Sequence, residues 1–294
     1  METMENLKKH VTVLSQDIGS HSIEEPDKLE AAAHYIEGEL ESVGLNVLRQ
    51  EYEAEGVPTA NLVARTPNWT GDAPVTVLGA HYDTVQGTPG ADDNASAVAV
   101  LIETARRINA DAPDKSGNLL FVAFSTEEPP CFGSDLMGSR IFTQRVKDSD
   151  MKIRGALVLE MVGYFSDEPG SQDIPPGLEF LGLPDVGNFI ALAADQQSDS
   201  LAGWTHKGIE ESDAGLPSIK LVDPGFIPGL GSLMRLSDNA SFWDDGIPAL
   251  MVTDTSFLRN PNYHKETDTA DTLDYEAMSK LVQALAYTLT QDHS

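Results

Sequence analysis

The sequence predicts an α/β fold of three layers, in which helices cover both faces of a mixed, largely parallel and twisted central sheet. Between residues 75 and 160, short apolar runs typical of buried strands alternate with amphipathic helical segments. The 294 residues, 40% of them hydrophobic, suffice for one large core, and the chain lacks internal repeats and low-complexity blocks. We therefore expect one globular domain covering residues 1–294.

The first 65 residues should form two helices and then two strands. Apolar residues at helical spacing predict an opening helix that stops near Gly19: Leu7, Val11, Leu14 and Ile18. A second helix should begin near Pro26, because the first helical turn tolerates proline, and should end near Gly44. Residues 46–52 and 61–65 have the composition of strands.

The next segment determines the architecture. Strands are predicted at 75–78, 119–124 and 155–159, and the helices between them at 95–108 and 136–145. A strand, helix, strand, helix, strand order requires crossover connections. Crossovers make neighbouring strands parallel and place helices on both faces of the sheet.

The last 130 residues are less regular. A helix is predicted at 186–196, strands at 219–222 and 249–253, and a closing amphipathic helix at 275–289. Segments near 164–180 and 203–247 are expected to be loop insertions, since the second is rich in Gly, Ser and Asp and has few periodic signals. We expect these loops to lie over the active site.

The charge balance is strongly acidic, with 47 Asp and Glu against 19 Lys and Arg and a net charge of −28. Such a surface repels phosphate backbones and anionic lipids, so we expect neither nucleic acid nor a membrane as a partner. The first residues contain no long apolar run, which predicts a cytoplasmic protein, or a secreted one if a leader was trimmed. A single cysteine, Cys131, excludes an internal disulfide framework.

Candidate metal ligands lie where the predicted strands end. His81 follows the first strand of the parallel segment, Glu127 and Glu128 follow the second, and Glu160 follows the third. Two more candidates lie in loops: Asp92 and His264. Ligands of open α/β sheets collect at the carboxyl ends of the strands, and imidazole and carboxylate are donors suited to zinc.

Six sequence blocks occur in order within about residues 75–275. They are His81-Tyr82-Asp83, Gly90-Ala91-Asp92-Asp93-Asn94-Ala95-Ser96, Ser125-Thr126-Glu127-Glu128, Leu159-Glu160-Met161-Val162-Gly163-Tyr164, Ser237-Asp238-Asn239-Ala240-Ser241-Phe242 and Tyr263-His264. Together they closely resemble the co-catalytic di-zinc aminopeptidase family, which also contains glutamate carboxypeptidase and, with one zinc, glutaminyl cyclase. The resemblance implies the zinc-exopeptidase, phosphorylase/hydrolase-like version of the fold.

The resemblance also implies a role for each matching residue. Two zinc ions per chain would be held by His81, Asp92, Glu128, Glu160 and His264. Asp92 would bridge them, and Glu127 would be the catalytic base that takes a proton from the metal-bound water and passes it to the leaving amine. Many family members have Asp where this chain has Glu160, which is one methylene longer and still an oxygen donor.

Residues around the ligands receive supporting roles from the same resemblance. Asp83 would hold the second ring nitrogen of His81, Asp93 would support the ligands without binding a metal itself, and the Asp92–Asp93 peptide is expected to be cis. Asp238 is expected to make structural hydrogen bonds near the site. Tyr263 would stabilise the developing oxyanion.

Two arginines are candidates for substrate binding. Arg235 and Arg259 are rare positive charges in predicted loops near the site. Either could clamp a substrate carboxylate, or could pair with a surface aspartate instead.

The function predicted from these residues is that of a metallo-aminopeptidase, which hydrolyses N-terminal residues from peptides or small-molecule amides. Two alternatives share the fold: a glutaminyl cyclase-like acyl transferase with one zinc, and a dipeptidase or carboxypeptidase. A catalytically silent binding domain is disfavoured because all candidate ligands and the base are present.

Overall fold

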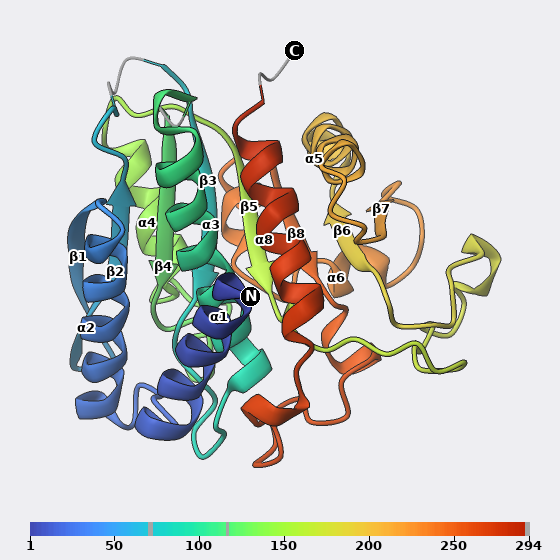
Figure 1. The fold of residues 1–294 in the computed structure, drawn as a ribbon, viewed down its shortest axis with the longest axis horizontal. Coiled ribbons are helices and arrows are strands. Elements are labelled where there is room, and N and C mark those ends of the chain that lie inside the picture. Colours follow the sequence, from blue (N-terminus) through green and yellow to red (C-terminus); the bar gives the residue numbers. More distant parts are fainter. Residues whose placement is uncertain (70–72, 116–117, 292–294) are drawn as a thin grey trace.

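An eight-stranded mixed sheet forms the centre of the protein (Figure 1). In this computed structural model, which describes residues 1–69, 73–115 and 118–291, the strand order is β1-β2-β4-β3-β5-β8-β6-β7. The strands are β1 (Asn46–Ala54), β2 (Val57–Arg65), β3 (Val75–His81), β4 (Leu119–Phe124), β5 (Ile153–Glu160), β6 (Ile190–Ala194), β7 (Ser218–Val222) and β8 (Ala249–Thr253). The four central strands β4, β3, β5 and β8 are parallel, β1, β2 and β6 introduce antiparallel pairings, and β7 is parallel to β6.

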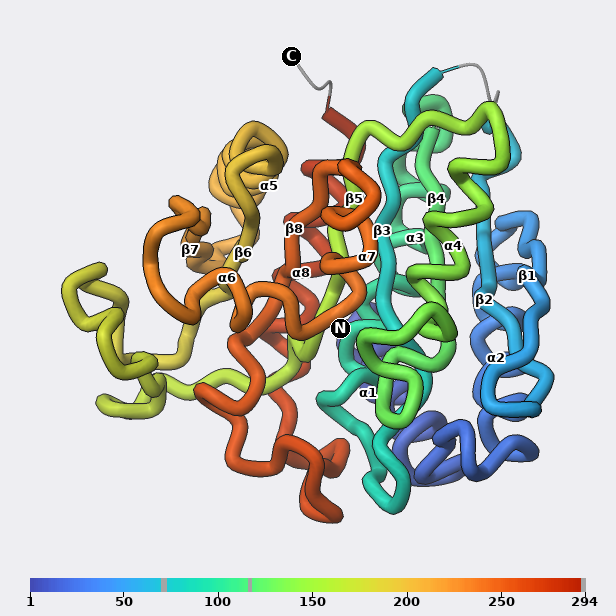
Figure 2. The backbone as a smooth tube through the Cα atoms, turned by 180° about the vertical axis from the view of Figure 1, so that it is seen from behind, coloured from blue at the N-terminus to red at the C-terminus, as the bar shows by residue number. Residues whose placement is uncertain are grey.

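Helices cover both faces of this sheet, which confirms the predicted three layers. One face carries α1 (Glu2–Thr12), α2 (Pro26–Ser42), α3 (Ala97–Asp111), α5 (Asp199–Glu211) and α8 (Tyr275–Leu289). The opposite face, seen in Figure 2, carries α4 (Gly138–Lys147), α6 (Leu230–Leu233) and α7 (Asn239–Asp244). Alternate residues of β3 serve the two layers: Leu78 and Ala80 pack with α3, whereas Val75 and Val77 pack with α4.

Several short helical segments connect these elements. Two of them are π-helical, Val13–Ile18 after α1 and Ala91–Ser96 before α3. Five are 3₁₀-helical: Pro113–Lys115, Glu179–Leu181, Gln196–Ser198, Ser256–Leu258 and Ala270–Thr272. None of the helices in the described ranges combines the length and the apolarity that crossing a membrane requires.

The order of the parallel strands creates a crevice at their carboxyl ends. The chain leaves β3 through α3 to reach β4 on one side, and then returns through α4 on the other face to reach β5 on the opposite side of β3. The segments that follow the neighbouring strands β3 and β4 therefore run to opposite faces of the sheet. In open α/β sheets this switch point is where ligands bind.

Most predicted elements in the first 160 residues are confirmed, but two predictions for the later part are wrong. Residues 190–194 form the buried strand β6 instead of a helix, because β8 and β7 pair with it on both sides. A five-residue apolar run cannot be assigned from periodicity alone, and tertiary pairing decides it.

The segment 203–247 is also more structured than predicted. It contains the end of α5, the strand β7 and the helices α6 and α7. The buried face of α5 includes Thr205 and Gly208, which weaken its apolar period, and α6 and α7 are too short to show a period. By contrast, residues 161–178 carry no helix or strand.

Candidate metal centre and active site

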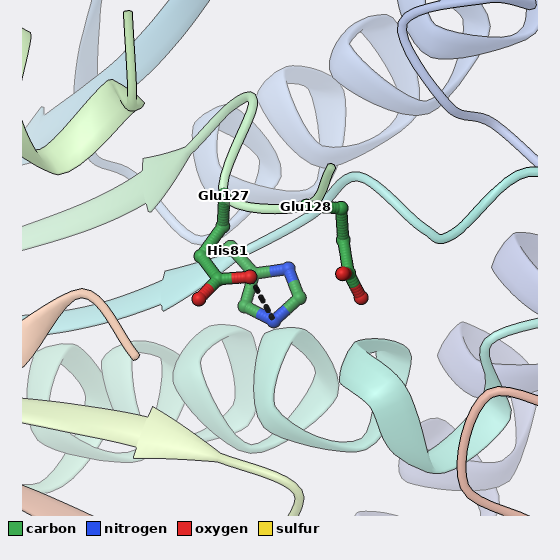
Figure 3. A group of neighbouring side chains, drawn as sticks. All are labelled: His81, Glu127 and Glu128. Carbon is green, nitrogen blue, oxygen red and sulfur yellow. Dashed lines mark ion pairs between the residues drawn. The ribbon is translucent and has the colours of Figure 1, made fainter. Parts of the chain in front are cut away.

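Three strands deliver acidic and imidazole groups to the crevice. His81 and Glu160 are the last residues of β3 and β5, and Glu127 and Glu128 lie in the turn that follows β4. All four side chains are buried. Figure 3 shows Glu127 directed at the His81 ring, with Glu127 Oε2 lying 3.9 Å from His81 Nε2.

Asp93 lies between two sets of donors. Its Oδ1 atom is 3.4 Å from His81 Nε2, which is itself 3.3 Å from Glu160 Oε2. Its Oδ2 atom is 3.1 Å from His264 Nε2, which is 3.5 Å from Glu128 Oε1. Asp93 thus belongs to two compact groups of three donors, one with His81 and Glu160 and one with Glu128 and His264.

The predicted bridging residue is therefore wrong by one position. Asp92 is turned away from both histidines, because Gly163 N–H donates to its Oδ1 at 2.9 Å and Asn260 Nδ2 donates to its Oδ2 at 2.6 Å. The cis peptide is also one residue further along, at Asp93–Asn94. Backbone angles at Asp93 and Asn94 are not helical, so this turn does not follow a regular period.

Unpaired buried atoms show that the two donor groups fit a cation. Within the described ranges, neither His81 Nε2 nor Asp93 Oδ1 has a hydrogen-bond partner, although both are buried. Burial and the charge of Asp93 raise the pKa of Glu128 to about 8. Burial lowers the pKa of His264, but contacts with Asp93 and Glu128 outweigh it and raise the pKa to about 10. Positive charge among these carboxylates would relieve their repulsion, and the donor set suits zinc.

Asp83 lies at the second ring nitrogen of His81, as predicted, and its carboxylate has a further role. The Nδ1 atom of His81 lies 3.1 Å from the backbone carbonyl of Asp83 and 3.5 Å from its carboxylate. The Asp83 carboxylate accepts the backbone N–H groups of Glu127 and Glu128, each at 3.0 Å. Asp83 therefore both orients the His81 ring through its carbonyl and holds the turn that carries the two glutamates.

Three residues near the ligands were missed by the sequence prediction. Ser237 Oγ donates to Glu160 Oε2 at 2.7 Å, and Asn260 donates to Asp92 as described above. Asp268 accepts the backbone N–H groups of Asp92 and Asp93. Ser237 begins one of the six blocks that carry the family resemblance, but no spacing signal marks Asn260 or Asp268, since their partners lie more than 160 residues away.

Two further predicted residues lie at the site. The Tyr263 ring stacks on the His264 ring with centroids 3.7 Å apart, and burial raises the pKa of its hydroxyl. Asp238 is fully buried at the start of α7, and burial raises its pKa to about 7. Neither carboxylate oxygen of Asp238 has a hydrogen bond of full geometry within the described ranges, but Ser139 interacts with it and lowers its pKa against the effect of burial, so the structural role of Asp238 stays a prediction.

The two arginines lie in different surroundings. Arg235 pairs with Asp244 on the surface and lies over the Trp243 ring, 5.7 Å from its centroid. Arg259 is buried, donating to Gln172 Oε1 at 2.9 Å and to the Phe189 carbonyl at 3.0 Å. Arg235 is thus paired within the protein, and Arg259 contacts two lining residues of the cavity described below while its Nη2 atom has no hydrogen-bond partner within the described ranges. The assignment of Arg235 to substrate binding is therefore not supported.

An apolar cavity of about 120 Å³ adjoins the metal-ligand cluster. Glu160 and Tyr263 belong to its lining, and the rest comes mainly from β6, β7, α6, β8 and the segment 172–183. Aliphatic side chains such as Leu221, Leu230 and Met251 dominate this lining, which contains no lysine or arginine.

Comparisons with known proteins agree with this geometry. Residues 61–289 match peptidase family M28. YfbL of Escherichia coli (strain K12), an uncharacterized protein, is 39% identical over 290 residues, which cover 96% of this chain and 86% of YfbL. The chain spans roughly half or less of the length of several other curated relatives.

Solved structures share the fold at low identity. The LapA aminopeptidase of Legionella pneumophila superposes with a TM-score of 0.74 at 21% identity, covering 98% of this chain and 68% of LapA. The glutaminyl cyclase of Tannerella forsythia gives a TM-score of 0.69 at 18% identity and covers 98% of each chain. The fold alone therefore does not separate hydrolysis from cyclisation.

Proposed function

The chain belongs to peptidase family M28, and on that premise we propose that it is an aminopeptidase that removes large apolar N-terminal residues from peptides with two bound zinc ions. Family membership makes it a zinc-dependent hydrolase of peptide bonds. The preference for large apolar N-terminal residues is proposed from one observation. The acidic ligand cluster adjoins the apolar cavity at Glu160 and Tyr263.

The charge of the site favours a substrate with a free amino terminus. Glu160 lines the cavity where it meets the donor groups, and Glu127 is the neighbouring carboxylate that is not assigned to a metal, so an ammonium group at this place would have an anionic partner. A carboxypeptidase or dipeptidase would need a cation for the terminal carboxylate. The residues that line the cavity include no lysine or arginine, and Arg235 is paired with Asp244 on the surface. Arg259 lies behind the lining residues Gln172 and Phe189 and does not itself line the cavity.

The cavity favours an apolar side chain next to the scissile bond. Its volume of about 120 Å³ and its aliphatic lining suit a residue of the size of leucine, methionine or phenylalanine. Burying such a side chain contributes on the order of 1.5–3 kcal/mol, so the cavity would select strongly against alanine and charged residues.

The two donor groups that share Asp93 support two metal positions. His81, Asp93 and Glu160 would hold one zinc, and Asp93, Glu128 and His264 the other. When bound, zinc supplies polarisation of the scissile carbonyl and a lowered pKa for a coordinated water.

The remaining chemistry falls to two side chains of the protein. Glu127 adjoins the ligands, and burial together with Glu128 and Glu160 holds its pKa well above the ordinary value despite the opposing effect of His81. A carboxylate that lies beside the donor groups and is not itself assigned to a metal is suited to accept a proton from the attacking water and to return it to the leaving amine. The Tyr263 hydroxyl is assigned to the developing oxyanion, because its ring lies against His264 and lines the cavity.

A substrate panel tests the proposal. The zinc-loaded chain is assayed with leucyl, phenylalanyl, alanyl, lysyl and N-acetyl-leucyl amides, and metal content is measured in parallel. We expect leucyl and phenylalanyl amides to be cleaved fastest, N-acetyl-leucyl amide to resist, and excess chelator to abolish turnover. Cleavage that persists in chelator, or that prefers N-acylated substrates, would overturn the assignment.

Glutaminyl cyclase activity is the alternative, because the Tannerella forsythia enzyme shares the fold across its whole length. Incubation with glutaminyl peptides and mass spectrometry for the loss of ammonia distinguishes the two reactions. Pyroglutamate formation with one zinc per chain would establish the cyclase, whereas release of free glutamine supports the aminopeptidase.

A further inference from the structure

We propose that Asp268 is a positioning residue that fixes the Asp93 carboxylate relative to His264, and that it thereby sets the affinity of the metal position these two residues share. The inference rests on the proposed metal centre. Asp268 itself contacts neither histidine; it acts through the backbone of the turn that carries Asp93.

The contacts of Asp268 concentrate on one short stretch of backbone. Its side chain is buried at 1% exposure. The Asp92 N–H lies 2.9 Å from Asp268 Oδ1 and 3.2 Å from Oδ2, and the Asp93 N–H donates to Oδ2 at 3.1 Å. The Ala91 N–H donates to the backbone carbonyl of Asp268 at 3.3 Å. Three consecutive backbone N–H groups, those of residues 91 to 93, therefore donate hydrogen bonds to Asp268.

A second buried aspartate, Asp83, accepts two successive backbone N–H groups in the same way. Asp83 accepts the N–H groups of Glu127 and Glu128, which follow β4, just as Asp268 accepts those of Asp92 and Asp93. In each case a buried aspartate holds two successive amides in a turn that carries metal-ligand candidates. The recurrence at both ligand-bearing turns argues that the function of the contact is to place ligands.

The turn at Asp93 needs an external support. Its backbone is non-helical at Asp93 (φ −104°, ψ 85°) and at Asn94 (φ −135°, ψ 29°), so a regular helical ladder does not fix the carboxylate. The Asp93 oxygens face in two directions, toward His81 and toward His264. A small rotation of the turn would change both contacts, but the one with His264 has the less rigid partner, because the His264 side chain is 33% exposed in a loop whereas His81 is 1% exposed at the end of a strand.

The support comes from the same segment that carries His264. Asn260, four residues before His264, donates to Asp92 Oδ2 at 2.6 Å, and Asp268 follows four residues after it. The Asp93 turn is therefore held on both sides of this ligand. By contrast, His81 and Glu160 are fixed by neighbouring strands, so loss of Asp268 should weaken mainly the metal position that includes His264.

The test compares Asp268→Asn with Asp271→Asn. The first variant keeps the size of the side chain but replaces one acceptor oxygen with an NH2 donor. With the NH2 at the place of Oδ1, it faces the Asp92 N–H, and with the NH2 at the place of Oδ2, the Asp93 N–H loses its acceptor. Asp271 is three residues away on the surface, where it accepts from Thr269, and its substitution makes the same change of charge. Zinc affinity and stoichiometry are measured by competition with a chromophoric chelator, and folding of the metal-free forms by circular dichroism and thermal unfolding.

We expect Asp268→Asn to bind one of the two zinc ions about 10- to 100-fold more weakly than the wild type, and Asp271→Asn to be unchanged. Wild-type affinity at both positions in a folded Asp268→Asn protein would overturn the inference, because a merely structural role lowers stability without changing the affinity of the folded fraction. Failure of the wild-type chain to bind zinc would instead overturn the proposed function.

If Asp268→Asn does not fold, Asp268→Glu replaces it. The longer side chain keeps both acceptor oxygens and the charge but displaces the turn, so we expect a folded protein with zinc affinity reduced at least about fivefold. Wild-type affinity in this variant would count against the inference.

Discussion

The site has a half delivered by strands and a half delivered by loops. His81 and Glu160 end β3 and β5, and their side chains are 1% and 9% exposed. Asp93, Tyr263 and His264 lie in irregular segments, and the His264 side chain is 33% exposed. The strand half is positioned by the hydrogen-bonded register of the sheet, whereas the loop half depends on contacts from Asn260 and Asp268. Local sequence therefore determines the first half, and long-range hydrogen bonds determine the second.

The largest expected effect concerns Glu127, which lies in the turn after β4, beside the strand half of the site. Glu127→Gln removes the proposed base and leaves both Asp93-centred donor groups intact, so turnover should fall about 10²- to 10⁴-fold while zinc content stays at the wild-type level. Steady-state kinetics on a leucyl amide and metal analysis check this. Near-normal turnover would show that another group takes the proton.

The loop half is tested by two neighbouring substitutions. Asp93→Asn should lower zinc affinity by more than about 100-fold, since Asp93 belongs to both donor groups. Asp92→Asn changes the same charge, but its side chain accepts from Gly163 and Asn260 and should not contact a metal directly, so its effect should be much smaller. Chelator competition measures both. The reverse order of effects would restore Asp92 as the ligand.

The apolar cavity adjoins both halves of the site, since Glu160 of the strand half and Tyr263 of the loop half line it. A change in the cavity should therefore alter substrate preference and leave both halves intact. Ala193→Met inserts a long side chain from β6 into the cavity. Cleavage of phenylalanyl amides should fall about 10- to 200-fold relative to alanyl amides. Ratios of kcat/KM for the two substrates report the change, and zinc content should remain constant. An unchanged ratio would mean that the substrate side chain binds elsewhere.

The clustered carboxylates predict a pH dependence of the metal-free protein. Burial raises the pKa of Glu128 to about 8 and that of Asp238 to about 7, so the folded state keeps protons that the unfolded state loses between about pH 4 and 8. Stability should therefore fall as pH rises through this window, and His264, whose pKa is raised to about 10, acts in the same direction. The Tm in chelator should be lower at pH 8 than at pH 5.5 by about 5 °C or more. Zinc should abolish the difference; equal Tm values in chelator would contradict the prediction.

The smallest effect is expected at Arg235. Its ion pair with Asp244 is on the surface, so Arg235→Ala should change the free energy of unfolding by about 1 kcal/mol or less. The kcat/KM for leucyl amides should stay within about twofold of the wild-type value. A large rise in KM alone would return Arg235 to the substrate site.

Strand-end positions were predictable from the sequence, because apolar runs revealed β3, β4 and β5 and the donors follow them directly. The sequence could not decide which of Asp92 and Asp93 is the metal ligand. Both lie in an irregular turn, which has no period that tells which side chain faces the crevice. The supporting roles of Asn260 and Asp268 could not be predicted for a different reason. Their partners lie more than 160 residues earlier, and only the folded chain brings them together.

The apolar cavity shares only Glu160 and Tyr263 with the predicted catalytic and metal-binding residues. Its remaining lining belongs largely to β6, β7, α6 and the segment 172–183, at the far edge of the sheet from β1 and β2. Mutations that accumulate in that edge can alter which peptides are accepted while the reaction chemistry is inherited unchanged.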